Sequence, residues 1–339
     1  MQNGLTNICK MKYRKFNNSG LYVSEIGIGT NRFGHNVDQN EVKQIIHYSL
    51  DEGINYIDTA NTYANGESEV SLGKAFDNNR KSFIVGTKVG WPNEFDANQG
   101  LLSSKSIFWH VDQSLKKLNT DYIDILWLHK WDDETPINET LNSVSILIKQ
   151  GKIRYLGISN FNSWQTSLIV TIARIKFDIS IISVQSEYNI IKRDTYLGLK
   201  ECINYLDINF IPYFPLASGF LTGKYSKNHI PSNSRGEWAT YMKKMLNIKH
   251  YHFIDELRLV ATSYNISLTE LSISWLLHHS NITSVICGVR NIEQLKTNAK
   301  SINCKLNKSD NNNIEILFKK YFKKKTKDGN RLVSRISCQ

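Results

Sequence analysis

The sequence has no apolar run long enough to cross a lipid bilayer. None of its stretches approaches the length of about 18 to 20 apolar residues that a membrane-spanning helix needs. The N-terminal residues MQNGLTNICKMKYRKF also lack the apolar core of a secretory signal. We therefore expect a cytoplasmic protein that does not span a membrane.

Paired cysteines are missing as well. The five cysteines are odd in number and widely spaced, and no two of them form a C-x-x-C pair. This pattern indicates neither a disulfide framework nor a zinc site, so we expect reduced thiols and no bound metal. The five are Cys9, Cys202, Cys287, Cys304 and Cys338.

The phosphate-binding motifs of the common nucleotide folds are absent. Residues 27–34, GIGTNRFG, follow a predicted strand, but the glycines are not spaced as G-x-G-x-x-G. No Lys-Ser or Lys-Thr follows them as in a P-loop. We interpret this segment as a strand-to-helix turn whose backbone comes close to a ligand.

The net charge of +11 is concentrated near the C-terminus. Residues 292–339 contain 12 Lys and Arg and 4 Asp and Glu, which leaves +3 for the rest of the chain. The run KKYFKKKTK at 319–327 is basic enough to contact nucleic acid or an anionic surface. A solvated helix end is the commoner origin of such a run, and we expect no nucleic-acid partner.

Short strand-like runs alternate with helical segments along the chain. Hydrophobic content of 41% and charged content of 22% are those of a globular protein. Over about 270 residues this alternation predicts a closed parallel (β/α)8 barrel, or TIM barrel, with residues 1–339 as one domain. An open doubly wound sheet is the alternative. The predicted strands are 25–30, 56–60, 83–89, 123–129, 153–159, 181–185, 210–216 and 282–288.

Three further segments are expected around this barrel. Residues 13–16 and 21–23 flank the turn sequence NNSG, which predicts a hairpin across the barrel floor. Residues 217–252 form a long segment after the seventh strand and are a candidate lid. Residues 292–300 and 313–325 are expected to be closing helices, and the second is followed by the basic tail within 301–339.

Four polar side chains fall at or just after predicted strand ends. Asp58 lies near the end of the second strand, and Tyr63 lies in the loop that follows it. Lys88 and His129 fall at the ends of the third and fourth strands. The C-terminal ends of parallel barrel strands meet at one face, and neighbouring strands are about 4.8 Å apart. The four groups can therefore surround one small volume.

The chemistry of these four groups is mutually consistent. A tyrosine with a pKa near 10 is a poor proton donor or acceptor unless a cation favours its phenolate, and Lys88 can supply that charge. Asp58 can hold Lys88 in place, and His129 can orient a substrate oxygen or relay its proton. A single strand-end lysine is usually a surface residue and a single histidine usually structural, so the hypothesis depends on all four.

A second functional segment is predicted after the eighth strand. Residues 288–298, GVRNIEQLKTN, leave the strand and begin a helix, where free backbone N–H groups and the helix dipole favour a phosphate. Arg290 is placed to bind such a phosphate in a bidentate manner. Phosphate sites are frequent in this region of barrel enzymes.

With these motifs, the sequence resembles the aldo-keto reductase family over residues 13–299. The resemblance is carried by GINYIDTA (53–60), GTKVG (86–90), DYIDILWLH (121–129), GKIRYLGISNF (151–161), VQSEYN (184–189) and PLASGFLTGKY (215–225). It implies a nicotinamide-dependent (β/α)8 barrel with the catalytic residues Asp58, Tyr63, Lys88 and His129. Phe214 and Cys287 depart from the family pattern, where a small polar residue and a proline are frequent.

The resemblance also implies which residues hold the cofactor, here NADPH. One set would hold the nicotinamide and line the pocket mouth, and a second would follow the pyrophosphate to the adenosine end. The first set is Gly29, Thr30, Asn31, Asp58, Ser159, Asn160, Gln185 and Tyr213, which would stack on the ring. The second set is Pro215, Leu216, Ser218, Lys224, Gly288, Arg290, Gln294 and Asn298, with Arg290 as the partner of a 2′-phosphate.

The function that the resemblance implies is reduction of a small-molecule carbonyl to an alcohol, with Tyr63 as general acid and base. Aldehydes, ketones and sugars all remain open as substrates, as do the direction of the reaction and the oligomeric state. Two alternatives come from other classes. One is a cofactor-binding potassium-channel subunit with little turnover, and the other is a redox sensor that binds polyanions through its basic tail.

Overall fold

Eight parallel strands form a closed barrel in the computed structural model, which describes residues 11–92, 101–232 and 234–322. The strands follow one another around the barrel in the order β10-β3-β4-β5-β6-β7-β8-β9. A parallel bridge between Phe210 and Ile282 joins β9 to the segment before β10, and the Phe210 N–H donates to the Asn281 carbonyl at 2.8 Å. The prediction of a (β/α)8 barrel is confirmed, and the open-sheet alternative is wrong.

The strands are short and most of their residues are buried, as expected for a parallel sheet that is covered on both faces. They are β3 (Ile26–Gly29), β4 (Tyr56–Asp58), β5 (Ile84–Val89), β6 (Ile123–Leu128), β7 (Ile153–Ser159), β8 (Ile181–Glu187), β9 (Asn209–Tyr213) and β10 (Val285–Gly288).

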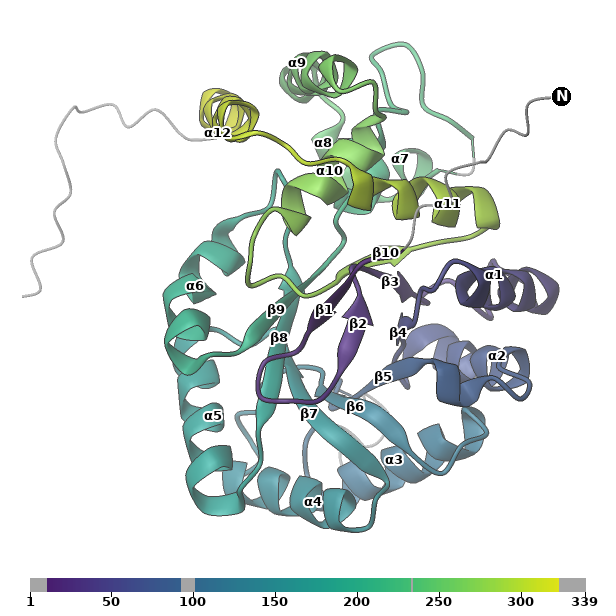
Figure 1. Ribbon diagram of the computed structural model, residues 1–339, viewed down its shortest axis with the longest axis vertical. Coiled ribbons are helices and arrows are strands. Elements are labelled where there is room, and N and C mark those ends of the chain that lie inside the picture. The colour runs from purple at the N-terminus through teal and green to yellow at the C-terminus, as the bar shows by residue number, and fades with distance from the viewer. Residues whose placement is uncertain (1–10, 93–100, 233, 323–339) are drawn as a thin grey trace, which may run out of the picture.

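Helices surround the barrel and extend it on one side. In Figure 1, α1 to α6 lie around the strands, whereas α7 to α9 and α12 gather beyond one edge of the barrel. The helices are α1 (Gln39–Asp51), α2 (Glu67–Ala75), α3 (Ser104–Lys117), α4 (Ile137–Lys149), α5 (Ser163–Phe177), α6 (Asp194–Leu206), α7 (Arg235–Trp238), α8 (Thr240–Met245), α9 (Ile248–Ser263), α10 (Leu268–Leu277), α11 (Ile292–Lys300) and α12 (Lys308–Phe322).

Several helices begin at capping residues that the sequence provides. The side chains of Asp38, Asn162 and Ser267 each accept a hydrogen bond from a first-turn N–H, and the backbone N–H of each donates to the side-chain oxygen of the residue three positions on. Such capping boxes satisfy backbone donors that a helix start otherwise leaves free. They define where α1, α5 and α10 begin.

The predicted hairpin is present and closes the barrel floor. Strands β1 (Tyr13–Lys15) and β2 (Tyr22–Ser24) pair antiparallel and lie in front of the barrel strands in Figure 1. Phe16, in the turn after β1, is fully buried and packs edge-on against Tyr56 of β4, with ring centroids 6.2 Å apart. Water is thereby excluded from the end opposite the strand C-termini.

A layer of large side chains fills the barrel between this floor and the strand ends. Trp127 of β6 spans the interior, and a side chain at Gly86 or Gly157 would approach its indole to 2.5 or 2.3 Å. Glycine on both neighbouring strands therefore makes room for the ring. Polar groups at the strand ends rest on this packed layer, so they are held at the opposite mouth.

Several boundaries differ from the sequence predictions. The seventh strand ends at Tyr213 rather than at residue 216, because Phe214 adopts a left-handed backbone with φ 51°. The expected long loop 217–252 contains a 3-10 turn, η3 (Ala217–Thr222), the short helices α7 and α8 and the start of α9. The last closing helix begins five residues earlier than predicted, at Lys308.

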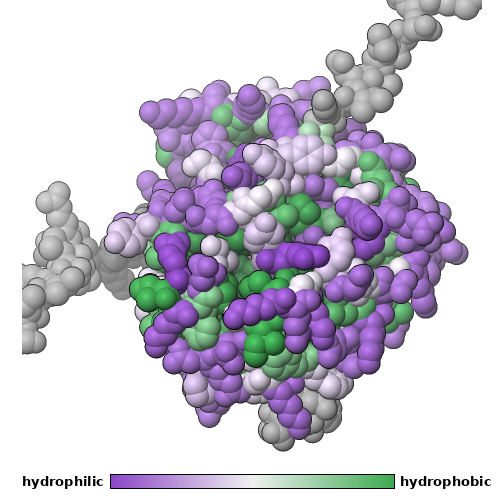
Figure 2. Space-filling view, turned by 60° about the horizontal axis from the view of Figure 1, so that its bottom comes forward, coloured by the Kyte–Doolittle hydropathy of each residue, from purple (hydrophilic) through white to green (hydrophobic). Residues whose placement is uncertain are grey.

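The basic tail after residue 322 and the first ten residues lie outside the described residues. In the part of the chain that the structure describes, no helix is both long and apolar enough to cross a membrane. Hydrophilic side chains cover most of the face in Figure 2, and apolar ones are confined to smaller areas among them.

Candidate active site

A cavity of about 960 Å³ opens at the C-terminal ends of the barrel strands. Asp58 is the last residue of β4, Lys88 lies one residue before the end of β5, and His129 directly follows β6. Tyr63 begins the 3-10 turn η1 (Tyr63–Gly66) after β4. All four side chains line the cavity, so the fold brings together the residues that were selected from strand ends.

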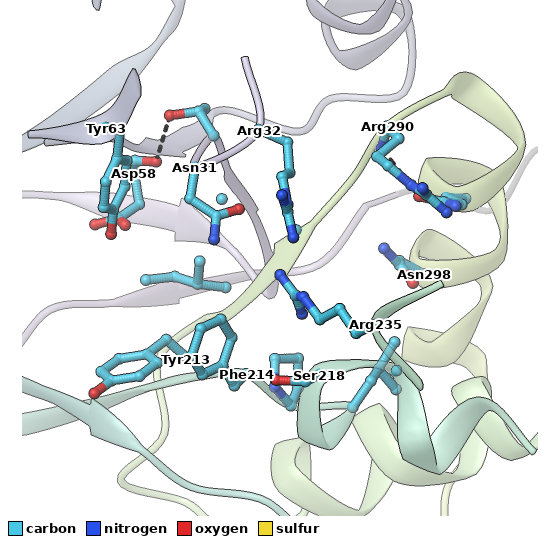
Figure 3. Close-up of a pocket in the computed structure, with 18 of the residues that line it drawn as sticks. Asn31, Arg32, Asp58, Tyr63, Tyr213, Phe214, Ser218, Arg235, Arg290 and Asn298 are labelled. Carbon is cyan, nitrogen blue, oxygen red and sulfur yellow. Dashed lines mark hydrogen bonds between the residues drawn. The ribbon is translucent and has the colours of Figure 1, made fainter. Parts of the chain in front are cut away.

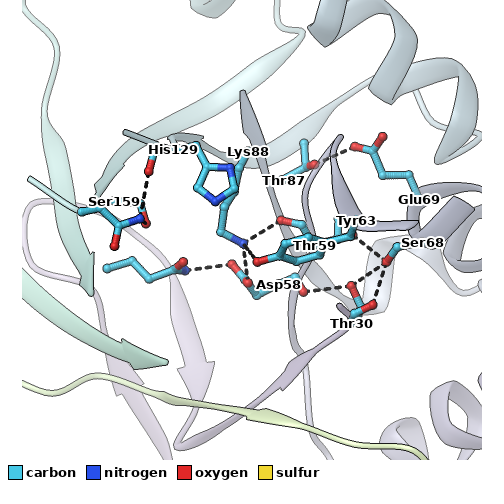
Figure 4. A network of polar contacts seen from close by, with 12 residues as sticks. Thr30, Asp58, Thr59, Tyr63, Ser68, Glu69, Thr87, Lys88, His129 and Ser159 are labelled. Carbon is cyan, nitrogen blue, oxygen red and sulfur yellow. Dashed lines mark hydrogen bonds and ion pairs between the residues drawn. The ribbon is translucent and has the colours of Figure 1, made fainter. Parts of the chain in front are cut away.

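Lys88 is the centre of the polar network at the cavity floor. Its side chain is 1% exposed, and its ammonium group donates to Asp58 Oδ2 at 2.6 Å, to the Thr59 carbonyl at 2.8 Å and to Tyr63 Oη at 3.1 Å (Figure 4). An ammonium group has three protons, and each has an acceptor here. The lysine is therefore held in one orientation, pointing at the phenol.

The Asp58 carboxylate has a partner on each oxygen. Oδ2 accepts from Lys88, and Oδ1 accepts from Gln185 Nε2 at 2.8 Å. Gln185 is expected to hold a cofactor amide, and in the structure its amide nitrogen also orients the carboxylate. Gln185 nevertheless lines the cavity, so its remaining donor and acceptor are close to any bound ligand.

Electrostatics leaves Tyr63 protonated at neutral pH. Burial raises the pKa of the Tyr63 phenol; the Lys88 ammonium group opposes this rise, and the Asp58 carboxylate adds to it. For Lys88, burial by itself lowers the pKa, but Asp58 and Tyr63 outweigh it, so the pKa is raised. The cavity thus presents a protonated phenol whose oxygen accepts a hydrogen bond from a charged ammonium group.

His129 is neutral over the whole physiological range. Burial and the nearby charge of Lys88 lower the pKa of His129 to about 3. Its ring lies perpendicular to that of Tyr63 with centroids 6.4 Å apart, and Trp91 packs on it at 4.7 Å. A neutral imidazole carries one N–H donor and one acceptor nitrogen, so it is suited to orient a substrate oxygen rather than to bind an anion.

A second polar chain runs from His129 to Tyr213. Asn160, whose backbone is left-handed with φ 61°, donates from Nδ2 to the His129 carbonyl at 3.0 Å. Its Oδ1 accepts from the Tyr213 hydroxyl at 2.7 Å. The Tyr213 ring is thereby held on the cavity wall.

The other residues expected to hold a cofactor also lie on the wall of this cavity. Arg290 and Asn298 come from α11 and the turn before it, on the side away from Tyr63 (Figure 3). The full set on the wall is Gly29, Thr30, Asn31, Ser159, Asn160, Gln185, Tyr213, Pro215, Leu216, Ser218, Lys224, Gly288, Arg290, Gln294 and Asn298.

Three guanidinium groups face the same part of the cavity. Arg32 and Arg235 approach one another between Tyr63 and Arg290 in Figure 3. Burial, followed by the positive charges of Arg235 and Arg290, lowers the pKa of Arg32. Within 11–92, 101–232 and 234–322, none of the three forms an ion pair with a carboxylate. Like charges left unneutralised in a cleft favour an anionic ligand with several charges.

A comparison of the sequence with known protein families agrees with the barrel and with the four polar residues at its strand ends. The sequence matches the Aldo/keto reductase family over residues 25–319. The chain belongs to the aldo/keto reductase family. It is therefore an oxidoreductase fold of the kind that generally uses NAD(P)H and acts on small carbonyl compounds.

Two kinds of protein are found among the relatives of this aldo/keto reductase. A probable voltage-gated potassium channel subunit beta of Oryza sativa subsp. japonica is 31% identical over 307 residues, which cover 86% of this chain and 91% of the relative. A protein of the same description from Arabidopsis thaliana is 31% identical over 314 residues, with 86% and 91% covered. The L-glyceraldehyde 3-phosphate reductase of Escherichia coli (strain K12) is 31% identical over 310 residues, with 87% and 88% covered.

The donor set of this aldo/keto reductase fits a dinucleotide phosphate. The guanidinium groups of Arg32, Arg235 and Arg290 and the ammonium group of Lys224 supply positive charge along the cavity, and the Tyr213 ring supplies an aromatic wall near the tetrad. Phe214, which departs from the family pattern, carries the Arg235 guanidinium over its ring at 5.7 Å. An aromatic residue here helps to hold the arginine over the cavity.

Sequence reasoning missed several residues of the cavity wall. Arg32 immediately follows Asn31, which was selected, and Arg235 and Trp238 lie in the segment proposed as a lid. Arg32 lies over the Trp238 ring at 5.9 Å, so two segments about 200 residues apart meet above the cavity. The positive charges in the loops after the first and seventh strands were the available signal. Trp91 and Lys130 were also missed.

Proposed function

We propose that this protein is an NADPH-dependent reductase that converts a small carbonyl compound to an alcohol, with Tyr63 as the proton donor. The observation that carries this proposal is the hydrogen bond from Lys88 Nζ to Tyr63 Oη, 3.1 Å long, within a buried network that opens onto the cavity. The reverse oxidation would use the same groups.

Each member of the tetrad has a role in the proton transfer. A bound nicotinamide supplies or accepts the hydride. Tyr63 donates its proton to the carbonyl oxygen as negative charge develops there, and Lys88 stabilises the phenolate that remains. Asp58 keeps Lys88 charged and oriented, and neutral His129 positions the substrate oxygen beside Tyr63.

The charges in the cavity favour NADPH over NADH. NADPH carries an additional phosphate, and Arg290 is the proposed partner of that group because it precedes α11 at the far end of the cavity. Arg32, Arg235 and Lys224 would neutralise the pyrophosphate. Ser159, Asn160 and Gln185 would contact the carboxamide, and Tyr213 would stack on the nicotinamide ring.

The test is a fluorescence titration with NADPH and with NADH, followed by a panel of carbonyl compounds. The panel includes glyceraldehyde 3-phosphate, because one relative is named as a reductase of that aldehyde. NADPH binding followed by carbonyl-dependent oxidation supports the proposal, whereas no binding of either nucleotide refutes it.

A tyrosine variant tests the assigned acid. Tyr63→Phe should lower kcat by a factor of about 10² to 10⁴, the usual contribution of a general acid. Its NADPH dissociation constant should stay near that of the wild type, because the phenol acts in the chemical step. Tyr205→Phe, at a side chain 90% exposed on α6, is the matched control and should retain full turnover. Wild-type turnover in Tyr63→Phe would refute the role of Tyr63.

The names of the plant relatives support a second candidate, a nucleotide-binding subunit of a membrane channel with slow turnover. The same cavity would bind the nucleotide in either role, so binding alone does not separate them. Tight NADPH binding without oxidation by any carbonyl of the panel would favour the subunit.

A further inference from the structure

Two adjacent residues at the start of α2, Ser68 and Glu69, are buried behind the candidate active site. Neither side chain has measurable exposure, and neither lines the cavity. They come five and six residues after Tyr63 in the sequence. Burying a carboxyl group is costly unless it is hydrogen-bonded, so its contacts indicate what it is there to hold.

Ser68 connects α2 to the ends of β3 and β4. Its Oγ atom lies 2.8 Å from Thr30 Oγ1 and 3.0 Å from Thr59 Oγ1, and it donates to the Thr30 carbonyl at 2.9 Å (Figure 4). Thr30 Oγ1 in turn donates to the Asp58 carbonyl at 3.0 Å. Thr59 directly follows Asp58, and its own carbonyl accepts from Lys88.

Glu69 connects α2 to β5. Its Oε1 atom accepts from the Thr87 hydroxyl at 2.6 Å. Thr87 directly precedes Lys88, and because side chains alternate along a strand, the two point to opposite faces of β5. Glu69 therefore holds the outer face of the residue next to the catalytic lysine. Lys117 of α3 and Lys88 are the charged groups that face Glu69.

The segment between Tyr63 and this helix start is strained. Ala64, Asn65 and Gly66 have left-handed backbones with φ of 49°, 57° and 92°. For a residue other than glycine the left-handed region costs about 1 to 2 kcal/mol, so surrounding contacts must hold the turn. Tyr63 lies at one end of the turn, and the buried pair lies just past the other.

We propose that Ser68 and Glu69 form an anchor that positions the Tyr63 phenol against the Lys88 ammonium group. They are positioning residues, since neither reaches the cavity, and the inference rests on the function proposed for Tyr63. The anchor ties the end of the strained turn to β3, β4 and β5. Strand β3 pairs with β4 beside Asp58, and β5 carries Lys88. If it is released, the turn relaxes and the phenol moves away from its cation.

The test is the titration of residue 63 by fluorine NMR in protein labelled with difluorotyrosine. The resonance is assigned by its loss in Tyr63→Phe. Asp58, Lys88 and His129 face the phenol, Tyr213 lies across the cavity, and Tyr56 lies below. These groups are unchanged in the variants, which are Thr87→Val and Ser68→Ala for the anchor.

Each variant has a matched control. Thr87→Ser keeps the hydroxyl that Glu69 accepts from. Thr140→Val removes another buried hydroxyl, which lies on α4 away from the tetrad. The Thr140 hydroxyl donates to the Leu102 carbonyl at 2.9 Å. If the anchor positions the phenol, Thr87→Val and Ser68→Ala raise the titration midpoint by about one pH unit, which corresponds to about 1.4 kcal/mol. Thr87→Ser and Thr140→Val keep the wild-type midpoint.

Turnover provides the second readout. In both anchor variants kcat for carbonyl reduction should fall about tenfold, and the NADPH dissociation constant should not change. An unchanged midpoint in both variants, even with a lower melting temperature or lower kcat, would overturn the inference and leave Ser68 and Glu69 as packing residues. If wild-type protein reduces no carbonyl, the proposed function fails, but the titration still decides whether the anchor exists.

Discussion

Replacing Lys88 with methionine tests the buried network at its centre. Methionine is similar in length and unbranched, so the change removes the charge and three hydrogen bonds with little change of shape. The side chains of Lys88 and Asp58 are 1% and 3% exposed. Removing one partner of a buried ion pair costs about 3 to 5 kcal/mol, because the other charge stays buried without its counter-ion. We expect Lys88→Met to lose that much free energy of unfolding at pH 8.

The loss should depend on pH in a definite direction. Burial raises the pKa of Asp58, and Lys88 and Gln185 oppose that rise in the wild type. In Lys88→Met only Gln185 opposes it, so the folded-state pKa lies well above the unfolded value near 3.9. The penalty is then largest above the folded pKa and shrinks as the pH falls and Asp58 takes up a proton. The free energy of unfolding of Lys88→Met should lie below that of the double variant Asp58→Asn/Lys88→Met, and this difference should be smaller at pH 5 than at pH 8.

Urea unfolding followed by circular dichroism measures these differences. The double variant Asp58→Asn/Lys88→Met should be more stable at pH 8 than Lys88→Met alone, because no charge of the Lys88–Asp58 pair is left buried without its partner. Lys320→Met is the matched control, since Lys320 pairs with Glu256 at 2.6 Å but is 56% exposed, and a solvent-exposed pair contributes little to stability. A loss below about 1 kcal/mol in Lys88→Met, or a double variant no more stable than the single one, would refute the reasoning.

Two further predictions concern the ends of the cavity. Arg290→Gln should weaken NADPH binding by about 10- to 100-fold, the value of one charge-assisted hydrogen bond, and leave NADH binding unchanged in fluorescence titrations. Equal weakening of both nucleotides would contradict the assignment of the 2′-phosphate. For His129, the folded-state pKa of about 3 lies below the unfolded value near 6.5, so the unfolded state binds the extra proton and stability falls as the pH is lowered between these values. Between pH 6.5 and 4.5 the free energy of unfolding of His129→Asn should therefore fall by about 2 to 3 kcal/mol less than that of the wild type, as measured by urea unfolding. If both proteins lost the same free energy of unfolding over this range, His129 would not be buried as a neutral ring.

Local sequence patterns were sufficient to predict the barrel strands and the hairpin. Parallel strands that are covered on both faces are short runs rich in Ile and Val, and this pattern is local. The position of a residue at a strand end is local as well, which is why Asp58, Lys88 and His129 could be selected before their contacts were known. Boundaries were less accurate where a single backbone angle ends an element, as at Phe214.

The segment 217–252 shows what local patterns do not predict. The helices α7 and α8 are only 4 and 6 residues long, and helices this short are marginal in isolation. Their stability comes from tertiary contacts, such as the packing of Gly236 against the Tyr225 hydroxyl, which accepts from the Gly236 N–H at 3.2 Å. A propensity argument therefore predicts a loop there.

The sequence alone determined which groups reach the mouth of the barrel, because strand ends and alternation follow from residues that are neighbours in the chain. Only the tertiary structure decided which partner each group has. Gln185 and Asp58 are 127 residues apart in sequence, and their hydrogen bond depends on the register of strands around a closed barrel. The same holds for the cluster of Arg32, Arg235 and Arg290 and for the anchor of Ser68 and Glu69. Hydrogen bonds and like-charge clusters act over a few ångströms, and distances that short between remote residues are set by packing.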